Sequence, residues 1–158
     1  MTFRKTKETR KKNISIGFLL EANKSRLRLT ALTGSIGLNK EITDKNIHRP
    51  GLALAGYVQL FRYDRVQVFG NTEMRYLEQL DDAQREKALQ TIFQFEMPCI
   101  VVTNDNKVDE SFLRFATERE VAVLQSPFET TKFIYFLDRK STRLNSSHIQ
   151  KSRMPSSA

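Results

Sequence analysis

Residues 49–70, RPGLALAGYVQLFRYDRVQVFG, contain three of the six glycines in this chain of 158 residues. The opening RPG predicts a turn, because proline fixes φ and Gly51 permits a positive φ. Gly56 predicts a close approach to a neighbouring backbone, so that Gly56→Val should crowd the fold. Residues 65–69, RVQVF, alternate polar and apolar side chains and stop at Gly70, as a strand does. A loop that contains several glycines is therefore expected to lead into a strand.

Beyond Gly70 the apolar residues recur at helical spacing instead. A first helix is expected after a cap at Asn71 or Thr72, because both residue types are preferred at helix starts. A second helix is expected after Asp81, with Gln84 three residues later in the capping-box position. Two consecutive helices should therefore follow the strand.

The next segments read as interior strands that alternate with helices. Continuous apolar runs at 99–103 and 121–124 are typical of strands covered on both faces. Helices are expected after a cap at Asp109 and over residues 130–137. This order predicts an α/β fold with a mainly parallel sheet, built from βα units with helices on both faces.

The chain before this region predicts shorter elements. Apolar positions favour a short amphipathic helix over residues 15–22, and RLRLT at 26–30 alternates as a strand would. Residues 38–43 suggest a short extended piece that leads to the turn at Arg49. No long helix fits between residues 24 and 50.

Polar residues follow the predicted parallel strands, at the edge where open α/β sheets usually bind ligands. The candidates for a ligand or interface site are Arg49, Asn71, Thr72, Thr103 and Asn104. One interpretation is an anion or small polar ligand held by hydroxyls and by free N–H groups of the helix that starts near Thr72. The other is that helix starts simply prefer Asn and Thr, and this second interpretation is favoured because it explains the residue types by itself.

No catalytic constellation stands out. Asp44, His48 and Arg49 are close in sequence and could form a general base with a cationic partner, but a lone loop histidine is usually a surface residue. Cys99 opens a buried strand, so a packed thiol is expected rather than an activated thiolate. Gly51 and Gly56 have the outer glycine spacing of a phosphate-binding P-loop, but Tyr57 stands where its lysine should be.

Composition limits the disulfides, metal sites and membrane helices that the chain could form. Because the chain has one cysteine, an internal disulfide is excluded. One cysteine and two histidines also cannot form a metal-binding cluster with the usual ligand spacing. No apolar run approaches the ~20 residues of a membrane helix. A soluble cytoplasmic protein without a membrane partner is expected.

The formal charge of +8 is concentrated at the two ends of the chain. Residues 1–12 carry six basic and one acidic residue, and residues 139–158 carry five basic and none acidic, which leaves 15 basic and 17 acidic residues between them. The globular part is therefore mildly acidic, and nucleic acid is not the expected partner. Residues 1–13 are predicted as a disordered basic head. Residues 138–158 resemble a translated sequencing adapter and are interpreted as a non-native tail.

Five segments of the sequence carry a resemblance to a known family. RPGLALAGY at 49–57, RVQVFGNTE at 65–73 and YLEQL at 76–80 resemble the amino-terminal domain of bacterial HPr(Ser) kinase/phosphorylase. PCIVVT at 98–103 and TTKFI at 130–134 follow in the same order. The similarity covers about residues 14–137.

The resemblance implies a two-domain cytoplasmic enzyme, usually a hexamer, that uses ATP and magnesium to phosphorylate a serine of the phosphocarrier HPr and can reverse the reaction. In that family the P-loop and the catalytic residues belong to a carboxyl-terminal domain. The chain is therefore interpreted as a truncated member of this family, whose complete enzyme acts in carbon catabolite regulation. It carries the accessory or regulatory amino-terminal domain, holds no cofactor itself and is inactive alone. A stand-alone domain that binds a small ligand is the alternative hypothesis.

Overall fold

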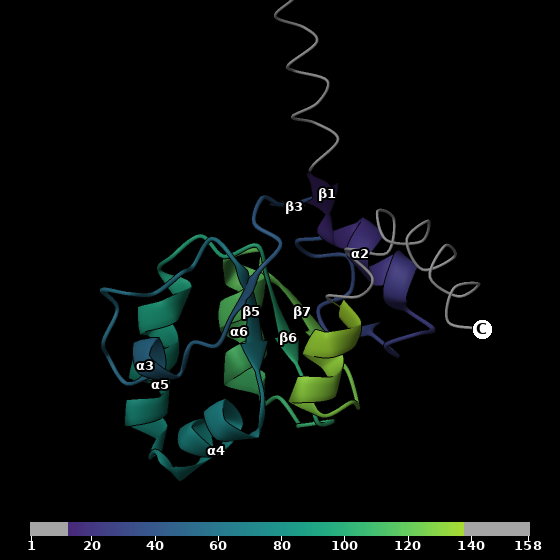
Figure 1. Ribbon diagram of the computed structural model, residues 1–158. Coiled ribbons are helices and arrows are strands. Elements are labelled where there is room, and N and C mark those ends of the chain that lie inside the picture. The colour runs from purple at the N-terminus through teal and green to yellow at the C-terminus, as the bar shows by residue number, and fades with distance from the viewer. Residues whose placement is uncertain (1–12, 138–158) are drawn as a thin grey trace, which may run out of the picture.

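A five-stranded sheet with the order β2-β7-β6-β5-β4 is the centre of the computed structural model, which describes residues 13–137 (Figure 1). The three longest strands, β5 (Val66–Phe69), β6 (Cys99–Val102) and β7 (Ala122–Gln125), are parallel to one another. β4 (Ile47–His48) pairs parallel with β5, and β2 (Thr30–Ala31) pairs antiparallel with β7. The predicted α/β fold with a mainly parallel sheet is confirmed.

Helices cover both faces of this sheet (Figure 1). On one face lie α3 (Gly51–Leu54), α4 (Asn71–Gln79), α5 (Asp82–Phe93) and α6 (Glu110–Glu118). On the other lie α2 (Ile16–Asn23) and a helix that begins at residue 130 and is described through residue 137. A separate two-stranded antiparallel pair joins β1 (Ile14–Ser15) to β3 (Glu41–Ile42).

The pleat of the strands divides their side chains between two hydrophobic clusters. Phe69 and Val102 pack with α5 and α6, whereas Val68 and Val101 pack with α2 and the helix at 130–137. All four residues of β5 are buried, including the polar Gln67, whose side-chain amide donates to two backbone carbonyl oxygens of the loop before the strand. A central parallel strand is covered on both faces, so its polar position is buried as well.

The caps of two helices are those expected from the sequence. Asp81 accepts a hydrogen bond from the backbone N–H of Gln84, and the Gln84 side chain accepts one from the N–H of Asp81, which completes the capping box of α5. Asp109 caps α6 by accepting from the N–H of Phe112. The cap of α4 was predicted one or two residues late, because the helix begins at Asn71 and Gly70 takes the cap position.

The predicted strand at 26–30 is wrong except at its last residue. Leu27 and Leu29 are buried, but they pack from irregular backbone, in which Arg28 has a φ of 53°. A residue in the left-handed region interrupts a strand. The polar and apolar residues of this segment therefore alternate because two leucines of a loop are buried in the core.

The roles expected for two glycines are also wrong. Gly51 has no positive φ and is the first residue of α3. A Cβ at Gly56 would meet nothing within 4 Å, so crowding is not what glycine avoids there. Its φ of +106° is the reason instead, because L side chains rarely adopt that conformation. The tight backbone approach lies at Gly37, against Glu120 and Ala122.

Candidate functional site at the carboxyl edge of the sheet

Four parallel strands end at the same edge of the sheet, the lower edge in Figure 1 where α4 begins. Arg49 follows β4, Gly70 follows β5, Thr103 follows β6 and Ser126 follows β7. The polar residues gathered here are called the carboxyl-edge cluster, and they are Arg49, Gly70, Asn71, Glu73, Thr103, Asn104, Asn106 and Thr130. Four of the five residues predicted from the sequence belong to it.

An ion pair joins two of the strand ends. Arg49 Nη2 lies 2.8 Å from Glu73 Oε1, and the same carboxylate oxygen accepts from the backbone N–H of Gly70 at 2.8 Å. The Glu73 side chain is only 4% exposed, whereas that of Arg49 is 38% exposed. A buried carboxylate at a helix start is stabilised by the N–H groups of the first turn and by a cationic partner. Arg49 is therefore held in place, with part of its guanidinium still facing solvent.

Gly70 lets these groups come close together. A Cβ at this position would lie 2.6 Å from Arg49 Nη2 and would also collide with the hydroxyl of Thr130. Its φ of −101° is open to any residue, so the need for glycine here is one of space.

Hydroxyl and amide groups form the second part of the cluster. Thr103 and Thr130 share a hydrogen bond of 2.6 Å between their hydroxyls, and Asn104 Nδ2 donates to Thr130 Oγ1 at 3.1 Å. Thr103 and Thr130 are both buried. Asn104 has a φ of 59°, and its backbone N–H donates to the carbonyl oxygen of Phe128. These contacts fasten the start of the last helix to the end of β6.

Asn71 and Thr72 lie on the exposed side of the same edge. The Asn71 side chain accepts from Asn106 Nδ2 at 3.0 Å, and the same amide donates to the carbonyl oxygen of Thr103 at 2.8 Å. Thr72 is in the first turn of α4 and takes part in no hydrogen bond of the carboxyl-edge cluster.

Four members of the cluster were not among the predicted site residues: Glu73, Asn106, Thr130 and Gly70, which was predicted only to end a strand. Glu73 carried a usable signal, because it stands three residues after the glycine that ends the strand, in the capping-box position. Asn106 and Thr130 carried none, since their partners Asn71 and Thr103 are 35 and 27 residues away. Most polar groups of the cluster bond to one another, which suits a rigid surface better than a reacting centre.

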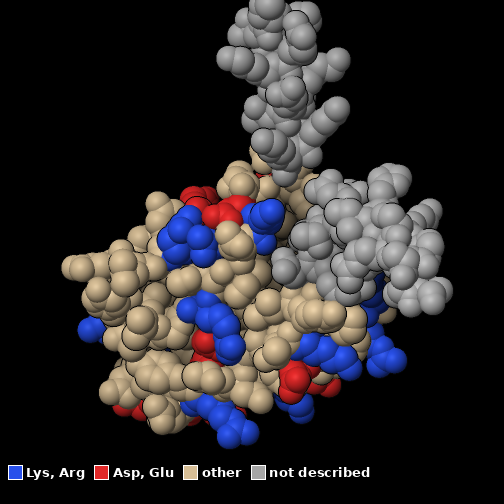
Figure 2. Space-filling view, viewed as in Figure 1, with Lys and Arg blue, Asp and Glu red and all other residues tan. Residues whose placement is uncertain are grey.

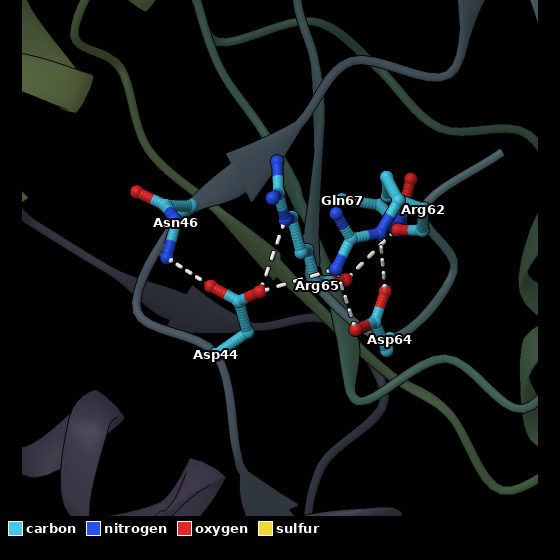
Figure 3. A network of polar contacts seen from close by, with 6 residues as sticks. All are labelled: Asp44, Asn46, Arg62, Asp64, Arg65 and Gln67. Carbon is cyan, nitrogen blue, oxygen red and sulfur yellow. Dashed lines mark hydrogen bonds and ion pairs between the residues drawn. The ribbon is translucent and has the colours of Figure 1, made fainter. Parts of the chain in front are cut away.

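The three residues weighed as a catalytic group have separate partners. Asp44 accepts from Arg62 and Arg65 at the opposite, amino edge of the sheet (Figure 3). Arg49 pairs with Glu73 instead. The His48 ring packs against Phe61, with ring centroids 5.6 Å apart. Burial, followed by the charges of Arg65 and Arg62, lowers the pKa of His48, so the imidazole is neutral at pH 7. The structure does not assemble them.

The remaining candidates have structural roles. Cys99 is buried in β6, and burial raises the pKa of its thiol to about 12, which keeps it protonated. In the segment from Gly51 to Tyr57, the N–H groups of Ala55, Gly56 and Tyr57 donate to carbonyl oxygens of α3 itself. Those amides do not point outward around a phosphate.

Residues 13–137 contain neither a metal-ion cluster nor a membrane-spanning helix. No group of three or more His, Cys, Asp or Glu side chains there could hold a metal ion. No helix in this part of the chain is both long and apolar enough to span a bilayer.

Comparison with known proteins gives a consistent result. A family model described as the HPr serine kinase N terminus matches residues 14–139. The HPr kinase/phosphorylase of Chloroherpeton thalassium is 42% identical over 139 residues, which are 87% of this chain and 41% of that protein. The protein of the same name from Chlorobium phaeobacteroides is 37% identical over 133 residues, 83% of this chain and 39% of its own. The chain therefore spans about two fifths of the length of these relatives.

A solved structure has a similar fold. It contains the CBS and DRTGG domains of the regulatory region of Clostridium perfringens pyrophosphatase, in complex with its activator diadenosine tetraphosphate. The TM-score is 0.50 at 10% sequence identity, and the match covers 78% of this chain and 50% of the other. At this identity the likeness concerns the fold alone.

Proposed function

This chain belongs to the HPr serine kinase N-terminal family, and from that premise we propose that it is the accessory, regulatory domain of an HPr kinase/phosphorylase. The observation that carries the proposal is the family match over residues 14–139, which includes all but the first of the described residues. The motifs at 49–57 and 65–73 form α3, β5 and the start of α4, so the sequence similarity falls on elements that build the sheet and its carboxyl edge.

The proposed parent enzyme transfers a phosphoryl group from ATP, with magnesium, to a serine of the phosphocarrier HPr and reverses that modification. The chemistry belongs to a carboxyl-terminal P-loop domain, which the relatives' additional length would accommodate. HPr is the protein partner of the complete enzyme, and the complete enzyme is a cytoplasmic hexamer. The 158-residue chain contributes no catalytic residue and holds no cofactor.

A role in contacts between domains or subunits is supported by an uncharged flank. Residues 50–61 contain no charged side chain, and four large apolar residues there or just beyond are well exposed. These are Leu52, Tyr57, Leu60 and Tyr63. Figure 2 shows the corresponding side of the molecule, on the left over α3, as a mostly tan surface. An exposed apolar patch is typical of an interaction surface.

Reading the genomic DNA beyond the codon for Leu137 tests this proposal. The expected result is an open reading frame that continues into a glycine-rich loop followed by Gly-Lys and Ser or Thr, the signature of a phosphate-binding P-loop. A natural stop codon, or a downstream domain without that signature, would contradict the assignment to this enzyme.

A stand-alone domain that binds a small ligand is the second candidate. It is favoured by the partial exposure of Arg49, whose guanidinium is held by Glu73 at the edge where α/β sheets usually bind ligands. Titration of the chain with inorganic phosphate, followed by amide shifts at Gly70 and Asn71, distinguishes the two. Saturable shifts that vanish in Arg49→Gln support the ligand-binding candidate, and their absence removes it.

A further inference from the structure

The amino edge of the sheet carries a cleft of about 300 Å³ that the proposed function does not use. Its lining residues are Lys45, Asn46, Ile47, Arg65, Ile134 and Leu137. The first three come from the segment that enters β4, Arg65 directly precedes β5, and the last two come from the end of the helix at 130–137. Polar and cationic groups thus line the cleft together with apolar ones.

Arg65 is fixed at the cleft by one side of its guanidinium. Its Nε donates to Asp44 Oδ2 at 3.2 Å, and Asp44 in turn accepts from the backbone N–H of Asn46 at 2.9 Å. Figure 3 shows the two terminal nitrogens of Arg65 extending past Asp44. Neither of them takes part in a hydrogen bond or ion pair found among residues 13–137. The side chain is only 24% exposed, so its position is set while two donor nitrogens stay available.

The charges around Arg65 leave a positive excess. Arg62 pairs with Asp64 and, at 3.3 Å, with Asp44, which also pairs with Arg65. The two carboxylates therefore balance the charges of the two arginines. Lys45 adds a third cation, and no ion pair of Lys45 occurs within the described part of the chain. The positive charges of Arg65 and Arg62 also help to lower the pKa of His48, although burial of the imidazole is the larger cause. The cleft is therefore cationic although the domain as a whole is mildly acidic.

We propose that this cleft binds a small organic acid, a carboxylate or phosphate group on an apolar body. The acid group pairs with the terminal nitrogens of Arg65 and with Lys45, because a guanidinium matches the two oxygens of such anions. The apolar body lies against Ile47, Ile134 and Leu137, all of which are half-buried. A volume of about 300 Å³ is at the lower end of the range for ligand pockets, which restricts the ligand to a small one.

The site is separate from the carboxyl-edge cluster and does not depend on the proposed enzyme. Asp44 and Asn46 position Arg65, while the helix at 130–137 links the two edges, beginning at Thr130 and reaching the cleft at Ile134 and Leu137. Loss of ligand binding would leave the family assignment intact. Conversely, failure to find a P-loop downstream would leave this cleft unchanged.

Titration of the 158-residue chain with benzoate and with phenyl phosphate, followed by amide NMR shifts, tests the proposal. We expect at least one of the two to bind with a Kd of about 1 mM or tighter and to shift the amides of Ile47 and Ile134. The two probes distinguish a carboxylate from a phosphate. Inorganic phosphate and benzyl alcohol, which carry only the anion or only the apolar body, should bind more weakly than the organic acid.

Variants locate the binding. Arg65→Gln should weaken it about tenfold or more, the loss expected for a hydrogen bond between charged groups, and Lys45→Glu should do the same without touching the Asp44 ion pair. Lys87→Gln, which removes one positive charge as Arg65→Gln does but at an exposed position of α5, is the control and should change nothing. If Arg65→Gln fails to fold, Lys45→Glu decides. The proposal is overturned if neither acid binds, if both cleft variants bind normally, or if inorganic phosphate binds as well as phenyl phosphate.

Discussion

Gly37 lies against strand β7, and a Cβ there would be 2.6 Å from the amide nitrogen of Ala122 and 2.8 Å from the carbonyl oxygen of Glu120. Its φ is +76°. Gly34 has a similar φ of +63° but nothing within 4 Å of its Cβ position. Gly34→Ala should therefore cost only the conformational term of about 1 kcal/mol, and Gly37→Ala should cost clearly more, because backbone must move. Urea unfolding of both variants measures this difference, and equal losses would contradict the packing argument.

Glu73 accepts from both Gly70 and Arg49 while almost fully buried. Glu73→Gln keeps the size but removes the charge, so we expect a loss of about 1–3 kcal/mol in the free energy of unfolding. Glu86→Gln is the matched control, since that carboxylate pairs with Arg114 at the surface with 57% of its side chain exposed, and it should cost about 0–1 kcal/mol. A Glu73 variant as stable as the control would show that the ion pair does not hold the edge together.

His48 should make stability depend on pH. Its pKa is lowered in the folded state from 6.5, mainly by burial, so below pH 6.5 the unfolded chain takes up a proton that the folded chain does not. The free energy of unfolding should therefore fall as the pH decreases from 6.5 toward the folded pKa. His48→Gln should remove this part of the slope. Asp44 and Asp64 act in a lower window, because their lowered pKa values stabilise the fold above 3.8 and lose that effect in acid.

Comparing the unfolding free energy of wild type and His48→Gln at pH 7 and pH 5.5 separates these contributions, since both carboxylates stay ionised over that interval. An identical change in the two proteins would contradict the role assigned to the histidine.

At the scale of elements, the cap of α6 gives a direct test. Asp109 accepts from the N–H of Phe112, and this helix covers the sheet with Phe112 and Ala116. Asp109→Ala should lower the free energy of unfolding by about 1 kcal/mol, whereas Asp109→Asn, which can also cap, should retain most of it. Chemical denaturation measures both. Equal losses in the two variants would show that the carboxylate's charge, and not its capping bond, matters.

The sequence predicted the elements that are buried on both faces or begin with a capping residue. The apolar runs at 99–103 and 121–124 correspond to β6 (Cys99–Val102) and β7 (Ala122–Gln125), because uninterrupted apolar runs suit a covered parallel sheet. It did not predict β4 or α3, which are two and four residues long and lack periodicity. The alternation of polar and apolar residues at 26–30 wrongly predicted a strand, because leucines in irregular backbone can be buried as regularly as those in a strand.

The candidate site was predictable in position but not in its pairing. Parallel strands end at one edge, so residues that follow them had to lie close together, as Asn71 and Thr103 do through their shared partner Asn106. Which groups bond there depends on contacts between distant segments, such as the pair of Arg49 with Glu73 across 24 residues. Whether Arg49, Asn71, Thr72, Thr103 and Asn104 bind a ligand or a partner stays a prediction.

At the scale of the whole molecule, three surfaces have different character. The carboxyl edge is polar and bonded within itself, and the amino edge carries the cationic cleft. The flank over α3 is mostly uncharged (Figure 2). Such a division suits a domain that contacts other parts of a larger enzyme, and the relatives it matches are more than twice as long.

The most direct test measures transfer of phosphate from ATP to the serine of HPr in the presence of magnesium. Three proteins are compared: this chain, the Chloroherpeton thalassium relative, and a chimera in which residues 14–137 of this chain replace the matching segment of that relative. We expect no transfer by the chain alone and restored transfer by the chimera, because the proposed function assigns an accessory role to this domain and the chemistry to the rest of the relative. Phosphorylation of HPr by the isolated chain, or a folded chimera without activity, would contradict this account.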